Sequence, residues 1–210
     1  GQVGHDAGIT YLIRGRASGM PADLMLADLT AQQGNRVLGT AEYERLGEYV
    51  TGLGDINGDG YGDIAIGAVT TNFSGRTYIM LGGTPSSQRD IDLQTPNQSN
   101  IIRITIGTSN AEAYHVSGIG DVNGDGFDDL LIGASNLAGG AAWVIFGRPT
   151  MPASISLTTP LTGEDGFRIS DAAYTAGYGV GGGDFNNDGF ADIILGAPFS
   201  SAGGSSSGEA

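Results

Sequence analysis

The residues with the clearest chemical potential lie in three nine-residue segments that repeat one pattern. They read D-I-N-G-D-G-Y-G-D at 55–63, D-V-N-G-D-G-F-D-D at 121–129 and D-F-N-N-D-G-F-A-D at 184–192. Each has a carboxylate or amide oxygen at positions 1, 3, 5 and 9, and a glycine at position 6, where the chain must turn sharply. This spacing of hard oxygen donors is typical of a loop that wraps one Ca²⁺ ion. The segments start 66 and then 63 residues apart, so the chain is predicted to be a repeat protein with a metal site in each repeat.

A simple hairpin turn and an EF-hand both fit the loop pattern less well. An isolated hairpin turn can use the same residues for Asx hydrogen bonds, but three copies in one phase, each with Asp at position 9, favour metal binding. An EF-hand requires a bidentate Glu at position 12, where this chain has Ile66, Ile132 or Leu195 within an apolar strand. Asp at position 9 would then supply the bidentate closure. Mg²⁺ fits less well than Ca²⁺ because it resists an all-protein cage.

Composition excludes several classes of protein. The chain has 23 acidic residues against nine arginines and no lysine, and its net charge of −14 excludes the basic face that nucleic-acid binding needs. Ten of the acidic residues lie in the three loops, so three bound Ca²⁺ ions would bring the charge to −8. No cysteine is present for disulfide or thiolate chemistry. No apolar run approaches the ~18 residues of a membrane span.

The segments around the loops follow a cycle of four short strands. A small, glycine-rich strand leads into the loop, and a fully apolar strand ending in Gly-Ala follows it. A third strand ends in Gly. A segment with short apolar alternation (90–93, 154–157) precedes a fourth strand, which carries an Arg between apolar neighbours. In cycle order, the expected strands are 48–54, 114–120 and 178–183; 64–66, 130–132 and 193–195; 10–13, 77–81 and 142–146; and 35–37, 102–104 and 167–169.

This cycle predicts an all-β fold, a β-propeller of four-stranded antiparallel blades, with about three blades' worth of strands in one domain over 1–210. The small first strands suit a crowded inner channel, although the third of them is one residue shorter than the others. Residues 23–33 are expected to be irregular. The first expected strand of the chain, 10–13, is a third strand of the cycle, and the last complete one, 193–195, is a second strand. Glu209-Ala210 has the character of a further third strand. We therefore expect either a segment of a larger propeller, which is favoured, or two copies associating through cut blade edges.

The loops, together with Gly196-Ala197-Pro198 and Phe146-Gly147, resemble the FG-GAP repeats of integrin α-subunit propellers and their bacterial relatives. The resemblance covers essentially the whole chain, although two copies lack the proline and two lack Phe-Gly. It implies Ca²⁺ between the first and second strands of each blade, with a backbone carbonyl at position 7 as a further ligand. The implied ligands are Asp55, Asn57, Asp59, Tyr61 and Asp63; Asp121, Asn123, Asp125, Phe127 and Asp129; and Asp184, Asn186, Asp188, Phe190 and Asp192.

Several other polar residues are interpreted as structural. His5 and His115 accompany no nucleophile motif, and His115 is expected to pack or face the channel. Asp128, at position 8 of the second loop, is expected to be solvated because the other loops have Gly62 and Ala191 there. Trp143 is expected in the core between blades. Arginines in the fourth strands are expected to link blades through acids or carbonyls: Arg36, Arg103 and Arg168.

The resemblance implies a secreted or cell-surface propeller, stabilised by Ca²⁺, that binds a protein or glycan through its loops in adhesion or surface assembly. No catalytic carboxylate pair or nucleophile motif lies outside the metal loops, so the chain is not expected to be an enzyme. Two alternatives remain open. The chain could be the non-catalytic propeller portion of a secreted enzyme, or a structural spacer of a large surface protein or filament. The lack of cysteine favours a bacterial secreted or surface protein.

Overall fold

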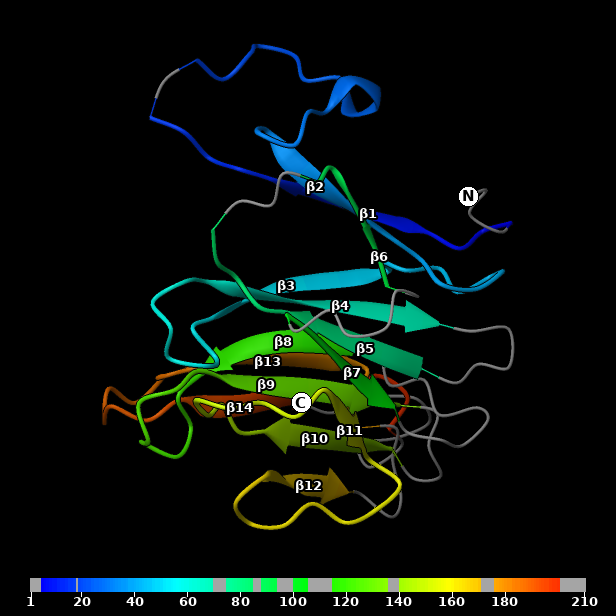
Figure 1. Ribbon diagram of the computed structural model, residues 1–210. Helices are drawn as coiled ribbons and strands as arrows, with labels where there is room; N and C mark the ends of the chain where they lie inside the picture. The colour runs from blue at the N-terminus through cyan, green and yellow to red at the C-terminus, as the bar shows by residue number, and fades with distance from the viewer. Residues whose placement is uncertain are drawn as a thin grey trace.

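Antiparallel strands build two complete blades, as Figure 1 shows. The computed structural model describes residues 5–17, 19–69, 75–84, 88–93, 100–105, 115–135, 140–170 and 176–200. The strands of each blade pair in chain order, which confirms the predicted cycle. The first full blade comprises β3 (Tyr49–Gly54), β4 (Asp63–Val69), β5 (Gly75–Met80) and β7 (Ile101–Thr105), and the second comprises β8 (His115–Gly120), β9 (Asp129–Ala134), β10 (Ala141–Ile145) and β12 (Gly166–Ser170).

A half-blade flanks the full blades on each side. The N-terminal half-blade pairs β1 (Ile9–Ile13) with β2 (Gly34–Leu38), and the C-terminal half-blade pairs β13 (Gly179–Gly183) with β14 (Asp192–Gly196). These are the third and fourth strands of one cycle and the first and second of another, as the sequence predicts. The segment expected to be irregular contains a single short 3-10 turn, η1 (Leu26–Asp28). The strand expected near Glu209-Ala210 lies outside the described residues.

Two further strands join successive blades in a way that the sequence did not predict. β6 (Asp90–Asp92) runs parallel to β2, and β11 (Ser154–Ser156) runs parallel to β7. Each comes from the connection before the fourth strand of one blade, and it adds a strand to the outer edge of the preceding blade. Arg36 of β2 holds β6 through a bidentate ion pair with Asp90, at 2.7 and 2.6 Å. The short apolar alternation at 90–93 and 154–157 therefore marks strands that connect one blade to the blade before it.

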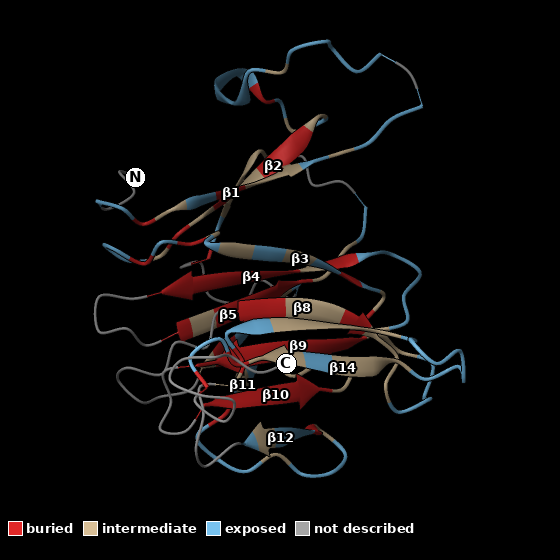
Figure 2. Cartoon of the chain, turned by 180° about the vertical axis from the view of Figure 1, so that it is seen from behind, coloured by how far each residue is buried: buried red, intermediate tan, exposed pale blue. Residues whose placement is uncertain are grey.

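Apolar clusters fill the spaces between successive blades, and Figure 2 shows the buried central strands. Ile66 and Tyr78 pack against the N-terminal half-blade. Between the full blades, the cluster includes Ile79 and Trp143, which confirms the core position predicted for Trp143. The third cluster lies between the second full blade and the C-terminal half-blade and includes Leu131. The core is therefore a series of inter-blade layers.

A β-bulge accounts for the shorter third copy of the first strand. β3 shifts register across Leu53, and β8 shifts at the matching place across Ile119. Both bulged side chains are buried between blades. β13 pairs Gly182 with Ile193 and Gly183 with Asp192 with no shift, so it needs one residue fewer. The absent residue is the bulge, and the pairing on either side of it is kept.

The first strands line up side by side, as expected for an inner channel. A Cβ at Gly118 of β8 would overlap the carbonyl oxygen of Gly52 in β3, so only glycine permits this approach. The ring of His115 lies between those of Tyr49 and Tyr178, with centroid distances of 4.4 and 5.1 Å. His115 is 3% exposed, which confirms its packing role.

Candidate metal centres

The three predicted loops occupy equivalent places in the fold. They join β3 to β4, β8 to β9, and β13 to β14, and they lie at one end of the blades (Figure 1). Positions 4 and 6 of every loop have φ between 60° and 92°, a left-handed conformation that Gly and Asn tolerate best. These turns curl the backbone so that the donor side chains of one loop face its own centre. The residues are Gly58 and Gly60, Gly124 and Gly126, and Asn187 and Gly189.

Hydrogen bonds close each loop in the same way. In the first loop, the Asp55 carboxylate accepts the N–H groups of Asp59 (3.0 Å) and Gly60 (2.8 Å). Asn57 Oδ1 accepts the N–H of Asp59 at 3.1 Å, and Asp59 Oδ1 accepts the N–H of Tyr61 at 2.9 Å. The second and third loops repeat these contacts at positions 1, 3 and 5. The structure therefore brings together the side chains predicted at these positions within each loop.

The carboxylate at position 9 anchors the loop to the blade. Asp63 Oδ2 accepts the N–H of Ile56 at 2.9 Å, and its Oδ1 accepts the N–H of Gly82 at 2.6 Å. The second loop repeats both contacts, with Gly147 as the glycine donor to Asp129 at 2.9 Å. The glycine after the third strand of each full blade thus has a physical role, because its N–H donates to the position 9 carboxylate of the metal loop. A carboxylate has about four acceptor sites, so lone pairs remain on both oxygens.

Burial makes the position 9 carboxylates of the two full blades unfavourable as lone anions. Asp129 is completely buried, and this burial raises its pKa to about 6, against the opposing N–H donors of Val122 and Gly147. The charges of Asp121 and Asp125 raise the pKa further. Burial likewise raises the pKa of Asp63. A cation beside these carboxylates would remove the repulsion and favour their ionised forms, so the loops fit Ca²⁺ electrostatically.

Carboxylates alone do not form the site. Among the described residues, no group of three or more His, Cys, Asp or Glu side chains is arranged to hold a metal ion. A metal in these loops would therefore also need the amide oxygen at position 3 and the carbonyl oxygen at position 7. That mixed, all-oxygen donor set is the one that Ca²⁺ accepts in proteins.

One sequence expectation for this region is wrong. Asp128 was expected to be solvated, but its Oδ2 accepts the N–H of Asp55 in the neighbouring loop at 2.8 Å. The reason is that the loop of the next blade lies directly on the loop of the preceding one, so residues 73 positions apart are in contact.

The expected linking role of the arginines holds for Arg36 and for Arg103, which donates to the carbonyl of Leu93 at 3.1 Å. Arg168 instead lies over the Trp143 ring, 5.4 Å from its centroid, and this contact joins neighbouring strands of one blade rather than two blades.

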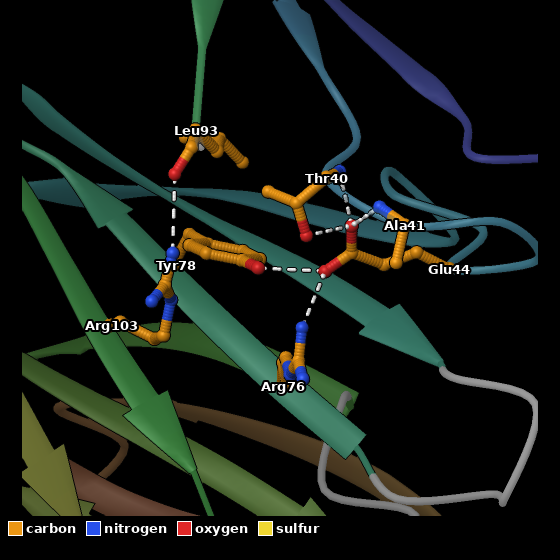
Figure 3. Close-up of polar contacts among 7 residues, drawn as sticks. All are labelled: Thr40, Ala41, Glu44, Arg76, Tyr78, Leu93 and Arg103. Atoms are coloured by element: carbon orange, nitrogen blue, oxygen red, sulfur yellow. Dashed lines mark hydrogen bonds and ion pairs between the residues drawn. The ribbon is translucent and has the colours of Figure 1, made fainter. Parts of the chain in front are cut away.

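A buried glutamate that sequence reasoning missed lies between the N-terminal half-blade and the first full blade (Figure 3). Glu44 is fully buried and accepts hydrogen bonds from Thr40 Oγ1 (2.6 Å), Ala41 N (3.1 Å) and Tyr78 OH (2.6 Å), and from the Thr40 N–H. Arg76 lies 3.3 Å away. Burial would raise the pKa of Glu44, but the hydrogen bonds from Thr40 and Tyr78 outweigh it and the pKa is lowered. No repeated pattern marks this residue in the sequence.

Comparison with known families agrees with this geometry. The FG-GAP repeat pattern matches residues 49–80, 114–145 and 176–210. The chain carries three FG-GAP repeats. The first two matches begin at the first strand of a full blade and end at its third, and the third begins just before β13. The resemblance predicted from the loops and the Gly-Ala and Phe-Gly motifs is thereby confirmed, as is the all-β fold.

The FG-GAP repeats are similar to parts of much longer proteins. Phosphatidylinositol-glycan-specific phospholipase D of Bos taurus is 28% identical over 176 residues, which are 79% of this chain and 20% of that protein. Integrin alpha-PS3 of Drosophila melanogaster is 35% identical over 98 residues, which are 44% of this chain and 8% of the integrin. Integrin alpha-IIb of Mus musculus is 30% identical over 96 residues, 46% of this chain and 9% of the integrin. The chain therefore spans about a fifth of these relatives or less.

Proposed function

We propose that this FG-GAP chain is a calcium-binding extracellular propeller module in which Ca²⁺ stabilises the loops between the first and second strands. The observation that carries the proposal is the shared construction of the loops. All three fold the side chains at positions 1 and 3 around the N–H of position 5 with the same hydrogen bonds, and in the full blades the position 9 carboxylate is buried.

The ion's contribution would be electrostatic and structural. Ca²⁺ would neutralise three carboxylates that otherwise repel one another, and it would tie the start of the loop to the start of the second strand. In the first loop these groups are Asp55, Asp59 and Asp63, with oxygens of Asn57 and Tyr61 completing the set. Extracellular Ca²⁺ is near millimolar and fills even sites of ~10⁻⁴ M affinity, which supports a surface or secreted location. Among the described residues, no helix is both long and apolar enough to cross a bilayer.

We further propose that the module serves in adhesion or surface assembly by binding a protein or glycan through propeller loops. The likeness to integrin alpha subunits supports this role. A second candidate is the non-catalytic propeller portion of a secreted enzyme. The likeness to phospholipase D favours it, because the match extends over 79% of this chain but only 20% of the enzyme. The first role is tested with a glycan array and with pull-down of surface proteins in Ca²⁺. Specific retention of one glycan or protein by the chain would support it.

Substitution of one loop carboxylate tests the metal sites. Asp125→Ala removes the side chain that accepts the N–H of Phe127 at 3.0 Å and the proposed ligand at position 5. We expect calorimetric Ca²⁺ titration to fall from three sites to two, with a stability loss of about 3 kcal/mol at millimolar Ca²⁺. Asp28→Ala, an exposed acid away from the loops, is the control and should keep three sites. Three sites in Asp125→Ala would contradict the ligand assignment.

Self-association of the 210-residue chain is a separate proposal, supported by its open half-blades. Ile194 is 49% exposed, whereas the equivalent Ala65 and Leu131 of the full blades are covered by the next blade. Within the described residues, β14 pairs only with β13 and β1 only with β2, and such free edges favour association. We expect light scattering in Ca²⁺ to show species above the 21.3 kDa monomer, and Ile194→Lys to reduce them. A strictly monomeric wild-type chain would contradict this proposal.

A further inference from the structure

The metal loops contact one another in sequence order. The N–H of Asp128 in the second loop donates to the carbonyl oxygen of Asp55 in the first at 3.3 Å. The N–H of Ala191 in the third loop donates to the carbonyl oxygen of Asp121 in the second at 2.8 Å. In both junctions, position 8 of one loop bonds to position 1 of the loop before it. Position 1 is a proposed metal ligand, so each of these junctions reaches a metal site from outside its own loop.

Aromatic rings strengthen the same junctions. The ring of Phe127 lies over Gly58, and the ring of Phe190 lies over Gly124. A Cβ added at Gly58 would come within 2.5 Å of Phe127 Cε1, so a side chain there would displace the ring. The two junctions therefore share their backbone contact and their ring packing, and they can be compared residue by residue.

A charged contact distinguishes the first junction from the second. The Asp128 carboxylate accepts the N–H of Asp55 at 2.8 Å, in addition to the backbone contact. Gly54 allows this approach, because a Cβ at that residue would overlap the carboxylate. The third loop has Ala191 at the matching position, and its methyl group cannot accept a hydrogen bond. A hydrogen bond to an ionised acceptor is shorter and about twice as strong as a neutral one.

We propose that Asp128 is a positioning residue for the metal site of the neighbouring first loop. This inference rests on the proposed Ca²⁺ binding. By holding the Asp55 N–H, Asp128 fixes the start of the first loop before the ion arrives, so less ordering is needed on binding. The second loop receives no such contact from Ala191. Asp128 thus sets the affinity of a site to which it donates no ligand.

A natural reporter makes the first loop separately observable. Position 7 is Tyr61 in the first loop and Phe in the second and third. Tb³⁺ bound in the first loop can therefore be excited through Tyr61, and Ca²⁺ affinity follows from displacement of that luminescence. Tyr61→Phe should abolish the signal and is the control for sensitisation by other aromatic residues. Calorimetric titration, rather than a second tyrosine, follows the other loops, because the Phe127 ring lies over Gly58 of the first loop.

We expect Asp128→Ala to weaken Ca²⁺ binding at the first loop about tenfold, equivalent to about 1.4 kcal/mol, with little change at the second. Asp128→Asn should recover most of the affinity, because its amide oxygen can accept the same N–H. Ala191→Asp should tighten the second loop, since Gly120 shares the left-handed backbone of Gly54. First-loop affinity unchanged in Asp128→Ala, or equally weak in Asp128→Asn, would overturn the positioning role.

Metal-free protein provides an independent measurement of the contact. The Asp55 amide should exchange its hydrogen faster in Asp128→Ala than in wild type, and equal exchange would overturn the inference. Failure of the proposed function has a different signature. Wild-type protein that binds no Ca²⁺ in calorimetry would overturn both the proposed function and the positioning role, whereas three occupied sites insensitive to Asp128→Ala would overturn the positioning role alone.

Discussion

Removal of Ca²⁺ is expected to lower the melting temperature by about 20 °C. A site with ~10 µM affinity at ~1 mM Ca²⁺ contributes about 2.7 kcal/mol, and three independent sites contribute about 8 kcal/mol. For a domain of this size, each kcal/mol corresponds to about 2–4 °C. The physical source is the carboxylate at position 9, which is buried in the first and second loops beside two further carboxylates. Differential scanning calorimetry with Ca²⁺ and with EGTA measures the difference.

Two controls make this measurement specific. Excess Ca²⁺ added back to the EGTA sample should restore the original melting curve, which separates metal removal from damage. Mg²⁺ at the same concentration should restore little, because it resists an all-protein cage. An identical melting curve in chelator would refute a structural role for the ion.

Loss of Glu44 is expected to destabilise the protein by about 3 kcal/mol or more. Glu44→Ala leaves the buried Tyr78 hydroxyl, and the N–H groups of Thr40 and Ala41, without their carboxylate partner. Breaking a buried charged network typically costs 3–5 kcal/mol. The Arg76 guanidinium, itself about one-third exposed, adds little because solvent screens it. Chemical denaturation in saturating Ca²⁺ measures the change without interference from the metal sites.

The matched control for this prediction is Glu42→Ala, which removes an exposed glutamate two residues away and should change stability by less than about 0.5 kcal/mol.

The pH dependence of the Glu44 contribution has a definite sign. Because the folded pKa of Glu44 is lowered from 4.5, its stabilisation is present above that value and is lost as the pH falls through the folded pKa. The free energy of unfolding of Glu44→Ala should therefore be lower than that of wild type at pH 7, and the difference should be smaller in acid. Equal losses for Glu44→Ala and Glu42→Ala would refute the role of the network.

Local chemistry made much of the fold and of the candidate site predictable. The loop pattern depends on residues within nine positions of one another, so Asp55, Asn57, Asp59 and their counterparts could be placed from spacing alone. The four-strand cycle follows from apolar alternation and glycine turns, which are also short-range properties. These features act within one hairpin, and the hairpin appears in the structure, although its second strand begins one residue earlier than expected, at the position 9 aspartate.

Tertiary structure decided the contacts that a residue makes with the neighbouring blade. Asp128 was misplaced because its partner, Asp55, is 73 residues away and lies beside it only when two loops stack. Glu44 carries no repeated signal, since its burial arises where one half-blade meets a full blade. The parallel pairing of β6 and β11 and the bulges at Leu53 and Ile119 follow from the same packing. The sequence by itself determined what each hairpin contains, and packing between blades determined which of its polar groups are buried, paired and coupled, because those contacts join residues far apart in the chain.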